Sequence, residues 1–133
     1  MLWFDVSCIG RNAPINTIGI VYRHQGSTNI PSFTSRMENI LNKLNHERAN
    51  FYIFVDYNIN LIKTDDVHNI SEFVNSMYSH SAVNLVNKPT RFPIGAQIGR
   101  PSLLDHLWTN MPFYVNKIDL IITPFLTIDP CSV

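Results

Sequence analysis

The hydrophobic positions of this chain change their spacing several times, and each change predicts a different element. Residues 2–7 and 17–22 are short, apolar and rich in β-branched and aromatic side chains, which is typical of strands. The stretch between them contains Gly10 and Pro14, which favour turns. Together these segments predict a hairpin or two neighbouring strands.

A helical pattern begins at Pro31 and runs to about residue 48, with Ser32 as the expected N-cap. Its apolar residues recur at spacings of three and four, as on one face of an amphipathic helix: Phe33, Met37, Ile40, Leu41 and Leu44. Five consecutive apolar residues then fill positions 51–55. This run is too short for a helix and predicts a strand that is covered on both faces.

A second helix is expected after a loop rich in Asn and Asp, with Ser71 or Asn69 available to cap it. Its apolar positions are Ile70, Phe73, Val74 and Met77. A short strand is expected at 83–86. The prolines and glycines of residues 87–102 then predict an irregular surface loop, a type of segment that often carries function.

Two more strands are plausible near the end of the sequence, at 103–108 and 117–123. Pro124 and Pro130 discourage regular structure beyond them. With no internal repeat, low-complexity tract or linker, residues 1–133 are expected to form a single α/β domain.

Composition supports a globular domain, because 45% of the 133 residues are hydrophobic. Ten Lys and Arg balance ten Asp and Glu, so the formal net charge is zero. The chain therefore lacks the strong basic field of a protein that holds nucleic acid by electrostatics alone. Any nuclease function must rest on a local site.

Targeting and redox features predict an intracellular protein, nuclear or cytoplasmic and not secreted. Cys8 and Cys131 lie far apart, without zinc-ligand spacing, which favours a reduced compartment. The apolar start is interrupted by Asp5 and lacks a basic region, so it does not have the pattern of a signal peptide. No apolar run approaches the roughly 20 residues that span a bilayer, so no membrane partner is expected.

Candidate chemistry centres on Asp56 and Asn58, which directly follow the apolar strand at 51–55. Ligands of open α/β sheets usually bind at the carboxyl ends of strands. The carboxylate could hold a hard cation or activate water, and the amide could hold phosphate. The alternative is that the two residues only shape an Asx-type turn.

Three further features accompany this pair along the chain. Tyr22 ends the second predicted strand, Thr90 and Arg91 open the long loop, and Asp105 interrupts an apolar strand, where an unpaired carboxylate is costly to bury. Each also has a plain structural interpretation. Tyr22 can be an aromatic residue at the edge of the core, Arg91 a solvated charge, and Asp105 a side chain that points to water.

In this order the motifs resemble the endonuclease/exonuclease/phosphatase superfamily, and most closely the endonuclease domains of non-LTR, LINE-like retrotransposons. The segment ending in Tyr22 resembles the family's strand-ending Tyr, and residues 55–58 resemble its Gly-Asp-Phe-Asn motif. Residues 89–91 resemble its Pro-Thr-Arg loop, and 102–105 its Ser-x-x-Asp strand. The similarity covers nearly the whole chain.

The resemblance implies a DNase I-like α/β (α+β) sandwich, with a two-sheet core flanked by helices, of which residues 1–133 would be an incomplete, C-terminal copy. It also implies Mg²⁺-assisted cleavage of a phosphodiester in DNA, with a reverse transcriptase domain in the same full-length polyprotein. Asp56 would position the attacking water, Asn58 and Tyr22 would contact phosphate, and Asp105 would orient a catalytic His. Thr90 and Arg91 would lie near the substrate, and Asp129 would be a weak metal ligand.

Two departures from the family pattern predict that these residues alone cleave negligibly. The family's early Asn and metal-binding Glu are expected upstream of residue 2, and Pro130 stands where the terminal His should be. Proline can neither accept a proton nor donate a side-chain hydrogen bond. Val55 also replaces the motif's Gly, which could crowd the site.

Two other functions compete with a retroelement endonuclease. One is a non-catalytic pseudoenzyme or interaction module that keeps the fold. The other is a phosphomonoesterase of the same superfamily that acts on small molecules or lipids, which the Pro-Thr-Arg loop disfavours. An incomplete sandwich would also expose an unpaired strand edge and an uncovered sheet face, both of which favour association.

Overall fold

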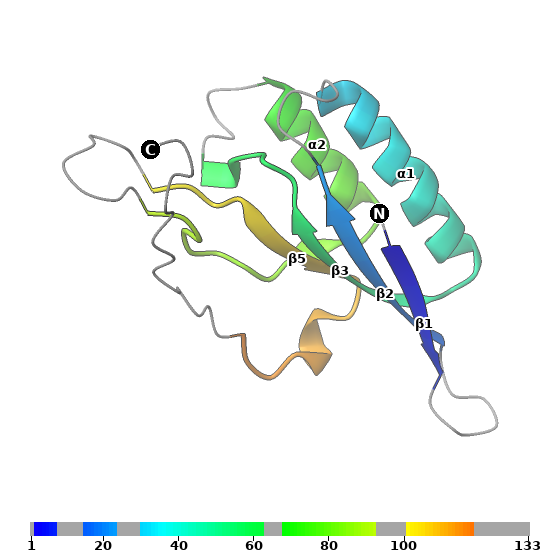
Figure 1. Ribbon diagram of the computed structural model, residues 1–133. Helices are drawn as coiled ribbons and strands as arrows, with labels where there is room; N and C mark the ends of the chain where they lie inside the picture. The colour runs from blue at the N-terminus through cyan, green and yellow to red at the C-terminus, as the bar shows by residue number, and fades with distance from the viewer. Residues whose placement is uncertain (1, 8–14, 24–29, 63–67, 93–100, 119–133) are drawn as a thin grey trace, which may run out of the picture.

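The computed structural model describes residues 2–7, 15–23, 30–62, 68–92 and 101–118 and shows a mixed α/β fold. Within these residues, five strands form one open sheet in the order β1-β2-β3-β5-β4, with two helices lying along one of its faces (Figure 1). The strands are β1 (Leu2–Ser7), β2 (Ile15–Tyr22), β3 (Asn50–Asp56), β4 (Val83–Asn84) and β5 (Asp105–Thr109). The helices are α1 (Ile30–His46), α2 (His68–Ser79) and the 3₁₀ helix η2 (Pro112–Tyr114).

The sheet is mixed because its strand pairs run in both directions. β1 pairs antiparallel with β2, which confirms the prediction that these two segments form a hairpin or neighbouring strands. β2 and β3 are parallel, with α1 as the crossover that a parallel pair needs, whereas β5 is antiparallel to both β3 and β4. The carboxyl ends of β2 and β3 therefore lie next to each other at one end of the sheet, beside the first residue of β5.

The core lies between the sheet and the two long helices. The helical spacing seen in the sequence places Phe33, Met37 and Leu41 of α1 against it, and Ile70, Phe73 and Met77 of α2. Phe51, Ile53 and Val55 of β3 meet them from the sheet. Tyr57 and Phe73 pack edge to face at 5.4 Å between ring centroids, and Trp108 of β5 is fully buried beside them.

The prediction that residues 51–55 are covered on both faces is wrong. Buried and exposed positions alternate along β3, and Phe54 is 47% exposed. The reason is that the described helices cover only one face of the sheet, so every second side chain of β3 stands on the other. An apolar run in the sequence reports strong β propensity at each position but does not reveal how many layers the fold contains.

The predicted helix caps are also wrong. α1 begins at Ile30 and α2 at His68, so Ser32, Asn69 and Ser71 lie inside the first turns of the helices. Pro31 suits a first helical turn because its missing N–H has no partner there anyway. It therefore belongs to α1 instead of preceding it.

The remaining predicted elements are shorter than expected or lie partly outside the described residues. The strand expected at 83–86 covers only Val83–Asn84, and the one expected at 103–108 is Asp105–Thr109. The loop after β4 has no regular structure through residue 92 apart from an isolated bridge between Arg91 and Ser102. Residues 119–123, Asp129, Pro130 and both cysteines lie outside the described residues.

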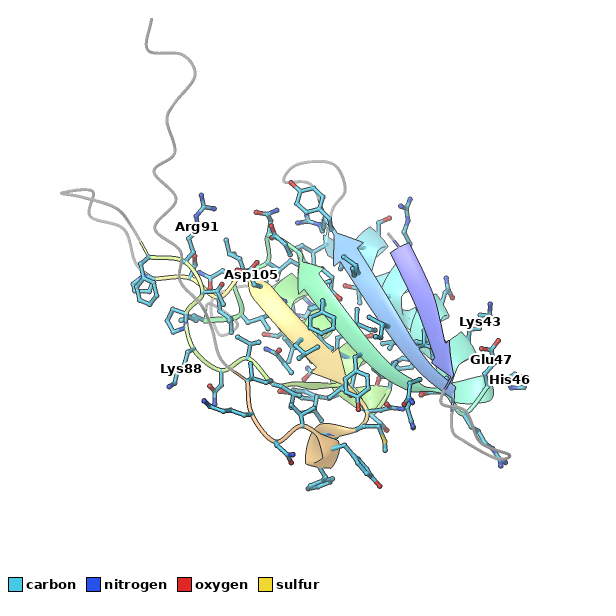
Figure 2. The ribbon with its side chains drawn as sticks, turned by 60° about the horizontal axis from the view of Figure 1, so that its bottom comes forward. Lys43, His46, Glu47, Lys88, Arg91 and Asp105 are labelled. Atoms are coloured by element: carbon cyan, nitrogen blue, oxygen red, sulfur yellow. The ribbon has the colours of Figure 1, made fainter. Side chains whose placement is uncertain are left out.

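The face of the sheet away from the helices, here called the open face, carries a group of apolar side chains. They come from three neighbouring strands, β2, β3 and β5, and are Ile18, Ile20, Tyr52, Phe54 and Leu107. Figure 2 views the sheet from this side, with neither long helix in front of it. Among the described residues, no helix is both long and apolar enough to cross a membrane.

Candidate functional site at one end of the sheet

Three predicted site residues form a row across three strands at one end of the sheet. Tyr22 is the register partner of Asp56 on the parallel neighbour, and Asp56 is the partner of Asp105 on the antiparallel neighbour. Partners in register project to the same face, so all three side chains stand on the open face. Tyr22 is 61% exposed, Asp56 is half-buried, and Asp105 is exposed at the start of β5 and does not interrupt a buried strand.

Asp56 and Asn58 shape the turn that follows β3. The Asn58 backbone N–H donates to Asp56 Oδ1 at 3.2 Å, which is an Asx-type contact. Asn58 has a φ of 53°, a left-handed conformation that Asn tolerates better than most residues. Its side-chain Nδ2 donates to the carbonyl oxygen of Arg23 at 2.9 Å. The interpretation that Asp56 and Asn58 shape an Asx-type turn is thus correct. The Asp56 carboxylate stands at the end of β3.

Arg23 is a residue of this site that the sequence did not single out. Its backbone N–H donates to the Asp56 carbonyl at 3.0 Å, and its guanidinium Nη1 donates to the Tyr57 carbonyl at 3.0 Å. Arg23 therefore continues the pairing of β2 with β3 beyond their last residues. Arg23 directly follows Tyr22 and belongs to no periodic pattern in the sequence, so nothing marked it as a site residue.

Thr90 holds the start of β5 in place. Its Oγ1 accepts hydrogen bonds from the backbone N–H groups of Leu104 at 3.1 Å and Asp105 at 3.2 Å. The backbone around it is fixed in turn, because Thr90 N and Arg91 N both donate to the Ser102 carbonyl at 2.9 and 3.0 Å. Thr90 thus sets the position of Asp105, whereas Arg91 is exposed at the same end of the molecule (Figure 2).

Asn60, in the segment after β3, makes a comparable contribution, and it was not among the site residues predicted from the sequence. Its Oδ1 accepts from the backbone N–H of Leu103 at 3.0 Å and of Ile62 at 3.2 Å. Together Thr90 and Asn60 supply partners for three consecutive N–H groups, those of residues 103–105. The asparagine-rich stretch after β3 was the available signal, since Asn side chains commonly bond nearby backbone groups.

Two carboxylates lie opposite each other at this end of the sheet. Asp56 and Asp105 oppose each other across an antiparallel pair, where like charges are destabilising. Two ion pairs among the described residues, Lys43–Glu47 at the C-terminal end of α1 and His68–Glu72 in α2, involve neither of these carboxylates. A divalent cation would relieve the repulsion, and Mg²⁺ commonly uses only one or two carboxylates together with water. The described residues hold no group of three or more His, Cys, Asp and Glu suited to a metal ion.

The sequence placed five of these residues in one functional group, and the structure brings Tyr22, Asp56, Asn58, Thr90 and Asp105 to the same end of the sheet. Arg91 joins them through its bridge to Ser102. Asp129, the weak metal ligand of the prediction, lies outside the described residues.

Comparison with known proteins adds no further identification. A scan against protein-family models, a search of curated proteins and a search of solved structures each found no match to this chain.

Proposed function

We propose that this chain is part of a metal-dependent endonuclease domain of the endonuclease/exonuclease/phosphatase type, from a non-LTR retrotransposon polyprotein that nicks target DNA before reverse transcription. One observation supports the proposal. Five residues chosen for their motif order, and spread from position 22 to position 105, converge at one end of the sheet. The convergence follows from the parallel pairing of β2 with β3 and the antiparallel pairing of β5 with β3, and it meets the first requirement of a shared site.

In the proposed site, Asp56 and Asp105 are the anionic groups that stand nearest to a phosphodiester. Asp56 would hold Mg²⁺ or the attacking water, and the cation would neutralise charge that develops on phosphate. Tyr22 would donate a hydrogen bond to a phosphate oxygen from its exposed position on β2. Asn58 Nδ2 is already committed to the Arg23 carbonyl, so its contribution is to fix the turn beside Asp56.

These 133 residues are expected to cleave DNA negligibly on their own. Pro130 occupies the position of the family's terminal His, and loss of a general acid or base of this kind lowers rates by roughly 10²–10⁴. The test is a plasmid-nicking assay in Mg²⁺. Nicking that disappears on Asp56→Ala would show that the chain is an active nuclease and would contradict this expectation.

Metal binding at the carboxylate pair can be tested separately from cleavage. Mg²⁺ that binds only the folded chain should stabilise it by about 1.4 kcal/mol at a free concentration of about ten times the dissociation constant. We expect Mg²⁺ to raise the thermal unfolding midpoint of the unmodified chain. The increase should be lost in both Asp56→Asn and Asp105→Asn.

The matched control for this titration is Glu47→Gln, which removes an exposed carboxylate at the opposite end of the molecule (Figure 2). It should leave the effect of Mg²⁺ unchanged. If Mg²⁺ has no effect on the unmodified chain, or if all three variants lose the effect equally, the proposed metal site is wrong. The interaction-module function would then be favoured.

A further inference from the structure

Two aromatic side chains project from η2 into solvent. Phe113 is 95% exposed, more than any other large hydrophobic side chain in the described part of the chain, and the adjacent Tyr114 is 74% exposed. A ring left in water forgoes the favourable burial of its apolar surface. Single exposed apolar residues are common, but an adjacent pair of almost fully exposed rings is a candidate contact surface.

The turn that carries this aromatic pair is held by backbone hydrogen bonds. The Tyr114 N–H donates to the Met111 carbonyl at 3.2 Å, and the next N–H, that of Val115, donates to the Pro112 carbonyl at 3.3 Å. The Met111 N–H donates to Thr109 Oγ1 at 3.0 Å, which ties the turn to the last residue of β5. Because the turn is already ordered, contacts made by its rings are not offset by the cost of ordering a loop.

The surface around the aromatic pair carries positive charge. Asn110 Nδ2 donates to the Ala49 carbonyl at 3.1 Å, which brings the preceding residue, Arg48, to the same end of the sheet as η2. Arg48 is exposed. Lys117, the only charged residue between positions 110 and 118, is exposed three residues after the pair. Glu47, which precedes Arg48, already forms an ion pair on α1.

The size of the aromatic pair favours a nucleic acid over a protein as the partner. Two aromatic side chains bury about 300–500 Å² at most. Each partner in a stable protein interface contributes roughly 800 Å², and the cations that flank the pair do not extend its apolar surface. A single ring can instead cover a nucleobase. Stacking of bases on aromatic side chains, with cations along the backbone, is how proteins hold single strands without sequence preference.

We propose that Phe113 and Tyr114 are a stacking platform for unpaired bases of a single-stranded nucleic acid, and that Arg48 and Lys117 contact its phosphates. A duplex does not offer its bases in this way, because they already stack on one another. β5 leads from the candidate site to η2, so the platform lies beyond the opposite end of the sheet (Figure 1). The proposal therefore does not rest on the proposed nuclease function.

Fluorescence anisotropy with a labelled oligothymidylate of about 12 nucleotides tests the platform in the full chain. We expect Phe113→Ala and Tyr114→Ala each to weaken binding about ten-fold. Both side chains are exposed, so the thermal unfolding midpoint should not change. Arg48→Gln and Lys117→Gln should each reduce the salt slope of log affinity by about 0.7, the value for one phosphate of a single strand. An unlabelled duplex of the same length should compete far less well than the unlabelled strand.

The matched controls are Arg91→Gln and Phe92→Ala, which remove an exposed cation and a 46% exposed ring at the end of the molecule that carries the candidate site (Figure 2). Both should leave strand binding unchanged. The proposal is overturned if the unmodified chain does not bind the strand, if the controls lose as much affinity as the platform variants, or if duplex competes equally well. Self-association on gel filtration that Phe113→Ala abolishes would overturn it in favour of a protein contact. None of these outcomes depends on Mg²⁺ or on cleavage.

Discussion

His106 shows at the residue scale how the candidate site is joined to the core. Its ring is buried on the helix side of β5, next to Tyr57 at 5.4 Å and Trp108 at 6.3 Å between ring centroids. Nε2 donates to the Leu103 carbonyl at 3.1 Å, and Nδ1 has no hydrogen-bond partner among the described residues. Burial lowers the pKa of His106 below its usual value, and the nearby Asp105 and Asp56 carboxylates partly oppose this.

Because His106 is neutral when buried, the stability of the fold should depend on pH. Below the unfolded-state pKa of about 6.5, the unfolded chain binds a proton that the folded chain does not, so the free energy of unfolding falls as pH falls. His106→Phe should weaken this dependence between pH 7.5 and pH 5. Urea unfolding of both proteins across that range measures it. The same slope in both would mean that other groups cause the pH dependence.

At the scale of elements, the beginning of β3 is fixed by the last residue of β5 and by the residue that follows it. Thr109 Oγ1 donates to the Phe51 carbonyl at 2.7 Å. Asn110 Oδ1 accepts from the Phe51 N–H at 3.0 Å, and its Nδ2 donates to the Ala49 carbonyl at 3.1 Å. These contacts set the register that places Asp105 opposite Asp56 at the other end of the same strand pair.

Removal of the Asn110 side chain should therefore destabilise the fold. Asn110→Ala leaves the N–H of a fully buried residue without its acceptor, a change that costs about 1–3 kcal/mol. Asn116→Ala, at an exposed position on the same connection, is the control and should change stability little. Chemical denaturation compares the two. An equal loss in both variants would mean that the contacts of Asn110 do not matter.

The elements themselves were largely predictable from sequence, because periodicity reports which side chains face a core. The amphipathic spacing of Phe33, Met37 and Leu41 and the run at 51–55 predicted α1 and β3 correctly. The exposure of Phe54 was not predictable, because the number of layers depends on how the elements pack together. The starts of α1 and α2 were misplaced because several polar residues near each start could serve as a cap.

The grouping of the candidate site could be predicted only from motif order, and of its internal contacts only the turn formed by Asp56 and Asn58 was predicted. Nothing in the sequence shows that Thr90 binds the backbone of Asp105, or that Asn60 binds that of Leu103, since each contact spans a loop. His106 was also missed as a core residue. It lies next to Asp105, but strand alternation sends its ring to the opposite face.

At the scale of the whole molecule, zero net charge makes the distribution of charge more important than its sum. Lys88 and Arg91 lie at the same end as Asp105, whereas Lys43, His46 and Glu47 lie at the other end (Figure 2). If the candidate site faces DNA, the two cations at its end should contact phosphate, and the distant lysine should not. Such contacts can be counted, because each phosphate neutralised adds about 0.9 to the slope of log affinity against log salt.

Arg91→Ala and Lys88→Ala should therefore each reduce the salt slope of binding to a short DNA duplex by about 0.9. Lys43→Ala removes the same unit of charge and only an exposed ion pair with Glu47, so it should leave the slope unchanged. Fluorescence anisotropy between about 50 and 200 mM salt measures all four proteins. Equal reductions in the three variants would indicate a response to net charge alone, and DNA would then not be held at the end of the sheet where Asp56 and Asp105 lie.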